Sequence, residues 1–273
     1  MSRLTETFDR LKDGVERGAG DPASKKRSGL VTSVTACDPD RTRSAEVLRA
    51  LDRGGADVIE VGVPFSDPIA DGPAIQRASE RALAAGGSLT AALDLVREVR
   101  STIVAPIVLF TYVNPVLRMG ADRFMTRAVE SGVDGVLLLD LPIEESGGMQ
   151  ADLTRHGLDQ IFLVSPTTTT ARMEEAGRLG RGFLYAISRL GVTGARETVA
   201  GSAAPLVARL REVTSLPIAL GFGISRPEHV AEVCQYADAA VVGSAIVEVI
   251  ARAAANGGDP GRDVEQFVRW LKG

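Results

Sequence analysis

The feature that most constrains the fold is an alternation of short apolar runs with longer amphipathic stretches, which begins near residue 29. The apolar runs are rich in Val, Ile and Leu, as strands buried on both faces of a parallel sheet are. The stretches between them have helical spacing of apolar residues. Eight strands are predicted in this way, at residues 30–35, 57–62, 106–110, 134–139, 160–164, 182–187, 217–221 and 239–243.

Eight βα units in about 250 residues favour a single α/β domain, a closed (β/α)8 TIM barrel. An open doubly wound sheet is the alternative. Residues 1–28 precede the first unit and read as an extra N-terminal helix followed by a polar linker. The expected organisation is therefore an N-terminal helix and linker over 1–28 and a barrel catalytic domain over 29–273.

Composition excludes several classes of protein. The chain is 45% hydrophobic and 24% charged, which suffices for one large core. A net charge of -4 lacks the basic excess of a nucleic-acid-binding protein. The amino terminus has no signal-peptide pattern, and no apolar stretch is long enough to span a membrane. We therefore expect a soluble cytoplasmic protein.

The scarcity of lysine and histidine limits the chemistry. Lysines lie only near the two ends of the chain, so its body has none for a Schiff base with pyridoxal phosphate. His156 and His229 stand alone, and Cys37 and Cys234 form no closely spaced pair, so no metal site is expected. Without a cofactor, acid–base chemistry would rely on carboxylates or tyrosines. The lysines are Lys12, Lys25, Lys26 and Lys272.

The second βα unit carries the strongest candidates. Its sequence, DVIEVGVPFSDPIADGP, places Glu60 inside an apolar strand and then Asp67 and Asp71 in the following loop. A carboxylate that faces a barrel interior is costly to bury unless it is protonated or paired, which is typical of a catalytic acid. The alternatives are an outward, salt-bridged Glu60 and aspartates that serve turns or helix caps.

Glycine-rich loops follow the seventh and eighth strands, where phosphate-binding barrels have them. The segments are GFGIS at 221–225 and VVGSAIV at 241–247. Their backbone N–H groups would bind a phosphate, although glycine also serves ordinary tight turns. Residues 188–205 form a long loop that reads as a lid or as a plain connection. Tyr112 and Tyr185, at strand ends, would contact a substrate or only the core.

These motifs resemble the tryptophan synthase alpha-subunit family. The block VIEVGVPFSDPIADGP is long and specific, and the similarity continues through DLPIEES, SRLGVTG, GFGIS and VGSAIV over nearly the whole chain from Gly29. Plant stand-alone indole-3-glycerol phosphate lyases share the same motifs. The resemblance implies a lyase of tryptophan biosynthesis that cleaves indole-3-glycerol phosphate by a retro-aldol step to indole and glyceraldehyde 3-phosphate.

The resemblance also implies roles for particular residues. Glu60 and Asp71 would be the catalytic pair. The phosphate would be bound by Gly194, Gly223, Gly243 and Ser244. The indole and glycerol parts would lie near Tyr112, Tyr185, Phe222 and Leu139. A partner would dock at Pro64, Asp67 and Asn114.

The implied partner is a tryptophan synthase beta subunit that holds pyridoxal phosphate, in an alpha2beta2 heterotetramer. Three alternatives are kept: a stand-alone indole-3-glycerol phosphate lyase, a weakly active subunit that activates its partner, and another phosphate-binding barrel such as an isomerase or epimerase. The loop from Glu60 to Asp71 speaks against the last of these, because an isomerase has no evident use for it.

One segment departs from the family pattern. Where the family usually has Pro, an aromatic residue and Gly, the segment TSVTACDP has Thr32, Ser33 and Cys37. The aromatic residue would ordinarily pack on the indole. Leu139 also stands where relatives have a smaller residue or proline. These departures leave the reaction class unchanged and predict an altered substrate fit.

Overall fold

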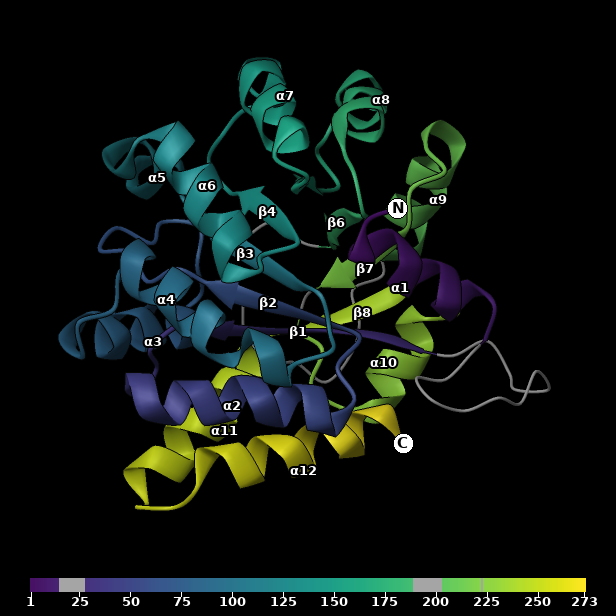
Figure 1. Cartoon of the computed structure of the whole chain (residues 1–273). Helices are drawn as coiled ribbons and strands as arrows, with labels where there is room; N and C mark the ends of the chain where they lie inside the picture. Colours follow the sequence, from purple (N-terminus) through teal and green to yellow (C-terminus); the bar gives the residue numbers. More distant parts are fainter. Residues whose placement is uncertain (15–27, 189–202, 222) are drawn as a thin grey trace.

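The computed structural model describes residues 1–14, 28–188, 203–221 and 223–273. Within them, eight parallel strands pair in sequence order, and β8 pairs with β1, which closes the barrel (Figure 1). The predicted TIM barrel is confirmed, and the open sheet is excluded. The strands are β1 (Gly29–Thr35), β2 (Val58–Gly62), β3 (Ile107–Thr111), β4 (Gly135–Leu138), β5 (Asp159–Val164), β6 (Leu184–Ile187), β7 (Ile218–Gly221) and β8 (Ala239–Val242).

Helices follow the strands and surround the barrel. Asp40 and Ser88 cap the starts of α2 and α4 with their side chains, and Gly55 ends α2 at a φ of 97°, which glycine adopts readily. The helices are α1 (Arg3–Lys12), α2 (Arg41–Gly54), α3 (Pro73–Ala84), α4 (Leu89–Val99), η1 (Arg100–Thr102), α5 (Val113–Met119), α6 (Ala121–Ser131), η2 (Ile143–Glu145), α7 (Gly147–Arg155), α8 (Thr170–Leu179), α9 (Ala203–Val213), α10 (Pro227–Val233), α11 (Ser244–Ala255) and α12 (Pro260–Lys272). Among the described residues, none of these helices combines the length and the apolar character needed to cross a membrane.

Alternation along the strands separates two apolar layers. In β2, Ile59 and Val61 face outward and join the layer between the strands and the helices. Val58 faces inward and joins the layer inside the barrel. Because successive side chains of a strand point to opposite faces, Glu60 also faces inward. The sequence therefore positions one carboxylate inside the barrel, two residues before the strand ends.

Helix α1 closes the end of the barrel at which the strands begin (Figure 1). Leu4, Phe8 and Leu11 are buried in the inner apolar layer, and the ring of Phe8 lies 5.2 Å from that of Phe183. The helix ends at Lys12, earlier than the sequence pattern indicated, and residues 15–27 of the predicted helix and linker lie outside the described residues. The side chains of α1 therefore fill this end of the barrel in the described part of the chain.

Candidate active site

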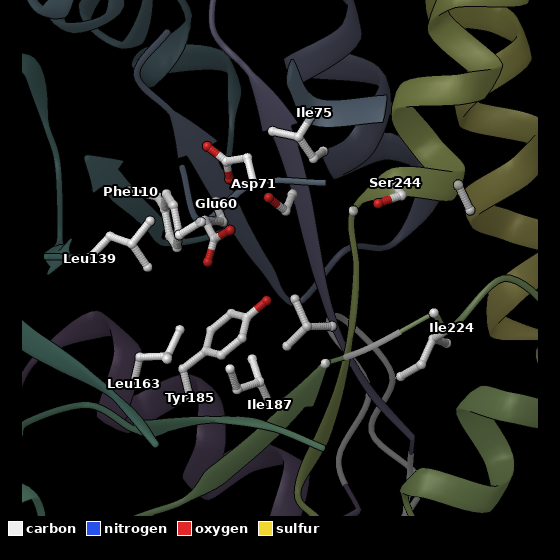
Figure 2. A pocket seen from close by; sticks show the side chains of 17 residues that line it. Glu60, Asp71, Ile75, Phe110, Leu139, Leu163, Tyr185, Ile187, Ile224 and Ser244 are labelled. Atoms are coloured by element: carbon white, nitrogen blue, oxygen red, sulfur yellow. The ribbon is translucent and has the colours of Figure 1, made fainter. Parts of the chain in front are cut away.

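A cavity of about 200 Å³ lies at the carboxyl ends of the strands (Figure 2). This is the end at which barrel enzymes carry their working residues. The cavity is lined by seven of the residues selected from the sequence, namely Glu60, Asp71, Leu139, Tyr185, Gly223, Gly243 and Ser244. Gly194 and Phe222 lie outside the described residues, as does most of the predicted lid, 189–202.

Glu60 is buried inside the barrel, and within the described structure its Oε2 has no hydrogen-bond partner. Burial is the main reason that its pKa rises to about 7, and the negative charge of Asp71 raises it further. A hydrogen bond with Ser33 acts in the opposite direction and lowers this pKa. Glu60 therefore exchanges a proton readily near neutral pH, as a general acid–base group must.

Asp71 lies in the loop between β2 and α3 and is held by an aromatic pair. The hydroxyl of Tyr112 donates to Oδ2 of Asp71 over 3.1 Å and accepts from the backbone N–H of Ala70 over 3.2 Å. Phe65 stacks on Tyr112 with the ring centroids 4.7 Å apart. Burial raises the pKa of Asp71, and the Tyr112 hydrogen bond lowers it. The structure thus places Tyr112 behind Asp71 rather than on the cavity wall.

Tyr185 reaches into the cavity from β6, and its hydroxyl points toward the space beside Glu60 (Figure 2). Burial raises the pKa of Tyr185 well above 10, and the charges of Glu60 and Asp71 raise it further. Its hydroxyl therefore stays protonated. The absence of a side chain at Gly221 leaves space for the Tyr185 hydroxyl, because a Cβ there would lie 2.9 Å from its oxygen.

The β7 and β8 loops form the other end of the cavity. Gly243 precedes α11, and no side chain caps this helix. The first N–H groups of a helix have no partner within it and bind anions well. Gly223 has a φ of 66°, a conformation that glycine adopts without strain. Gly243, Ser244 and Gly223 thus offer backbone donors with little bulk around them.

Sequence reasoning selected Leu139 and missed the rest of the apolar wall of the cavity. Phe110 on β3 and Leu163 on β5 line it, and each lies two residues after a side chain of the inner layer, Val108 and Ile161. Two-residue alternation identifies them once the inward face of each strand is known, which the structure shows. Other apolar lining residues are Ile75, Ile187, Ile224 and Val241.

Ser33 and Cys37, which differ from the family pattern in β1 and the loop after it, have separate structural consequences. Ser33 lines the cavity beside Glu60. Cys37 is buried with a φ of 67°, a left-handed conformation that explains why glycine is usual there. Neighbouring Asp38 is buried and accepts two hydrogen bonds from Arg81 of α3, at 2.7 and 2.8 Å. This pair ties the β1 loop to the helix that follows Asp71.

The three residues predicted at a partner interface are not equivalent. Asp67 and Asn114 are exposed near the mouth of the barrel, whereas Pro64 is buried within the chain. Two large apolar side chains on the same segments are also exposed, Ile69 at 88% and Leu117 at 59%. A groove of about 470 Å³ connects the β2 loop to α5, with Pro64, Phe65, Pro115 and Met119 among its lining residues.

Relatives of known sequence match the whole chain. The tryptophan synthase alpha chain of Solibacter usitatus is 47% identical over 272 residues, which cover 100% of this chain and 97% of the relative. That of Geobacter sulfurreducens is also 47% identical over 272 residues, which cover 100% of this chain and 98% of the relative.

Solved structures agree with this fold and this family. The tryptophan synthase subunit alpha of Legionella pneumophila has a TM-score of 0.86 and 35% identity, covering 100% of this chain and 97% of that chain. A structure of Mycobacterium tuberculosis tryptophan synthase has a TM-score of 0.87 and 35% identity, covering 99% and 97%. The family model for "Tryptophan synthase alpha chain" matches residues 21–272. This chain therefore belongs to the tryptophan synthase alpha chain family.

Proposed function

We propose that Glu60 and Asp71 carry the reaction of this lyase. As a member of its family the chain acts in tryptophan biosynthesis, where it cleaves indole-3-glycerol phosphate. The observation that supports the residue assignment best is the pairing of a buried Glu60, whose pKa is about 7, with Asp71 across the same cavity. The products are indole and glyceraldehyde 3-phosphate.

In the first step, protonated Glu60 gives its proton to C3 of the indole ring. The ring becomes an iminium-like cation, which supplies the electron sink that aldolases otherwise take from a lysine imine or a metal. The positive charge is greatest at the ring N–H. Asp71, held in place by Tyr112, stabilises this charge as a carboxylate.

In the second step, Glu60 is ionised and acts as the base. It takes the proton of the glycerol hydroxyl adjacent to the ring while the C–C bond to C3 breaks. The hydroxyl carbon becomes an aldehyde, and the electron pair of the broken bond restores the neutral aromatic ring. Glu60 ends protonated, ready for the next turnover, so no external proton donor is consumed.

The two ends of the cavity suit the two ends of this substrate. The phosphate would accept hydrogen bonds at Gly223, Gly243 and Ser244, with Gly194 completing the set implied by the family. The indole would lie against Tyr185 and Leu139, with Phe222 of the family pattern. We add Phe110 to this wall, because it is the one aromatic side chain besides Tyr185 among the described lining residues.

We further propose that the partner is a beta subunit that holds pyridoxal phosphate, in an alpha2beta2 heterotetramer in the cytoplasm. The chain itself would need no cofactor. The docking face would include Asp67 and Asn114, joined by the exposed Ile69 and Leu117 around the groove. Apolar side chains exposed on neighbouring segments are typical of an interface. Pro64 would support this face from beneath.

The division of the chain at residue 28 also remains a proposal. It is supported by the start of β1 at Gly29 and by the burial of Leu4 and Phe8 of α1 in the inner apolar layer. In this view residues 1–28 close the barrel formed by residues 29–273. Removal of residues 1–12 should then lower the thermal midpoint and expose apolar surface.

Turnover of indole-3-glycerol phosphate by the purified chain, with and without purified beta subunit, tests the function. We expect slow cleavage alone and a marked rise on adding the partner, because docking orders the loops around the carboxylates. Brisk activity alone with no complex would favour the stand-alone lyase. Stimulation of the partner without any cleavage would favour a subunit that only activates.

A further inference from the structure

Ser33 is the cavity residue at which this chain differs most clearly from the family pattern. It lies on β1 in register with Glu60 on β2, and both side chains line the cavity. Adjacent strands lie about 4.8 Å apart, so paired residues on one face are immediate neighbours. The aromatic residue usual at this position has no hydroxyl if it is phenylalanine and a distant one if it is tyrosine. Serine places a short hydroxyl beside the acid–base carboxylate.

The surroundings of Glu60 offer few other donors. Oε2 of Glu60 is buried and has no hydrogen-bond partner among the described residues. Asp71 also faces the cavity and can only repel the ionised carboxylate, while Phe110 and Leu139 are apolar. Tyr185 faces the cavity with a protonated hydroxyl, but Ser33 alone supplies a hydrogen bond that lowers the pKa of Glu60.

Gly243 on the β8 loop is a second neighbour of Ser33, and as a glycine it leaves space beside the Ser33 side chain. A Cβ placed on Gly243 would lie 3.4 Å from Cβ of Ser33 and 3.7 Å from its Oγ. The β8 loop therefore lies directly against the side of Ser33, opposite the strand that carries Glu60. This leaves the hydroxyl between the acid–base group and the loop assigned to the phosphate.

We propose that Ser33 is a positioning residue whose hydroxyl donates a hydrogen bond to the Glu60 carboxylate and holds it toward the substrate between the two proton transfers. The inference rests on the proposed role of Glu60. It assigns to Ser33 a task that an aromatic ring at this position would not perform. The hydroxyl stays on Ser33 throughout, so it adds no proton to the reaction.

The proposal has a consequence for pH dependence. Glu60 must be protonated to start the reaction, so activity falls as pH rises through its pKa. Loss of the Ser33 hydroxyl removes an interaction that favours the charged form, and this raises the pKa of Glu60. The alkaline limb of the kcat/KM profile should then move to higher pH. The acid limb should stay in place, because it would reflect protonation of Asp71, which must be a carboxylate to stabilise the ring cation.

The test compares Ser33→Ala, which removes the hydroxyl, with Ser33→Thr, which keeps one. Thr32→Val is the matched control, because it removes a hydroxyl one residue away on the outer face of the same strand, where that hydroxyl donates to the Val58 carbonyl and not to Glu60. The pKa of Glu60 is followed by carbon NMR of carboxyl-labelled glutamate, with the Glu60→Gln variant assigning the signal. Steady-state kinetics give kcat and KM over the same pH range.

We expect Ser33→Ala to raise the pKa of Glu60 and the alkaline limb together by about one pH unit. Ser33→Thr and Thr32→Val should remain close to the unmodified chain. An unchanged Glu60 signal in Ser33→Ala, or a shift in Ser33→Thr as large as in Ser33→Ala, would overturn the proposal. The NMR arm needs no turnover, so it stays decisive even if the assigned reaction fails.

Discussion

Buried and half-buried carboxylates lie at both ends of the barrel, and their partners differ. At the end where the strands begin, Asp57 accepts a hydrogen bond from the backbone N–H of Leu30 at 2.8 Å and pairs with Lys272 at 2.6 Å. Asp134 accepts from the N–H of Ile107 at 2.7 Å and lies 3.6 Å from Arg100. Each of these carboxylates has a cationic partner, Lys272 or Arg100, so their interactions hold strands and helices together.

At the mouth, Glu60 and Asp71 lie in one cavity, and neither forms an ion pair within the described part of the chain. Burial raises the pKa of Asp134 as it does that of Glu60, so burial alone does not distinguish the carboxylates proposed to be catalytic. What sets Glu60 and Asp71 apart from Asp57 and Asp134 is that no cationic side chain pairs with them among the described residues. A carboxylate left without a cation remains available to exchange a proton or to meet a positive charge on the substrate.

The largest effect should follow a change at the mouth. Glu60→Gln should lower turnover about 10²-fold or more, the scale of losing a general acid–base group. Folding should persist, because the amide has nearly the same shape. Glu98→Gln, at an exposed helical position, is the control and should leave turnover unchanged. Near-normal turnover of Glu60→Gln would remove this residue from the mechanism.

The same variant should gain stability above neutral pH. Between the ordinary pKa of 4.5 and the native value of about 7, folded Glu60 holds a proton that the unfolded chain has released. The stability of the unmodified chain should therefore fall as pH rises through this window. Glu60→Gln lacks this loss and should be more stable above pH 7 by about 3 kcal/mol. Urea unfolding at pH 4 and pH 8 measures the difference.

A change at the opposite end should affect stability instead of chemistry. Asp57→Ala leaves the half-buried ammonium of Lys272 with only the Ser28 carbonyl as a partner, and it leaves the N–H of Leu30 without its carboxylate acceptor. The free energy of unfolding should fall by about 3 kcal/mol, with kcat per folded molecule unchanged. Arg97→Ala breaks the exposed pair with Glu130 and should cost far less. A large loss of kcat from Asp57→Ala would end the distinction between the two ends.

A smaller effect is expected at the β7 and β8 loops, where we propose that backbone N–H groups bind the substrate phosphate. Gly243→Val places a side chain against Ser33 and over the start of α11. Binding of glycerol 3-phosphate should weaken about 10-fold, the loss of one hydrogen bond to a charged group. Gly147→Val, at an exposed glycine with open space around it, serves as the control. Equal affinity of both variants by calorimetry would place the phosphate elsewhere.

The contrast between the two ends also separates what the sequence could predict from what it could not. The barrel followed from the strand rhythm, but the inward position of Glu60 was settled only by the structure, because β2 is apolar on both faces and the sequence left an outward, salt-bridged Glu60 open. The cations that pair with the carboxylates could not be predicted from the sequence either, because Asp57 and Lys272 are 215 residues apart and meet only when the barrel closes. For the same reason, the support that Tyr112 gives to Asp71 was visible only in the structure. Alternation along β3 places Phe110 in the cavity only once Val108 is known to face inward, and the structure supplied that fact.

The smallest predicted effect concerns the aromatic wall. Ser33 replaces the usual aromatic residue of β1, and Phe110 supplies a ring from β3 in the same cavity. Phe110→Leu should weaken indole binding about fivefold, since one aromatic contact contributes about 1 kcal/mol.

A double variant tests whether the ring can come from β1 instead of β3. If it can, the double change Ser33→Phe with Phe110→Leu should restore indole affinity. The double variant should nevertheless keep the raised alkaline limb of Ser33→Ala, because it lacks the hydroxyl beside Glu60. Fluorescence titration with indole and the kcat/KM profile measure the two effects separately. If the double variant does not recover indole affinity, indole binding in this chain requires an aromatic side chain on β3.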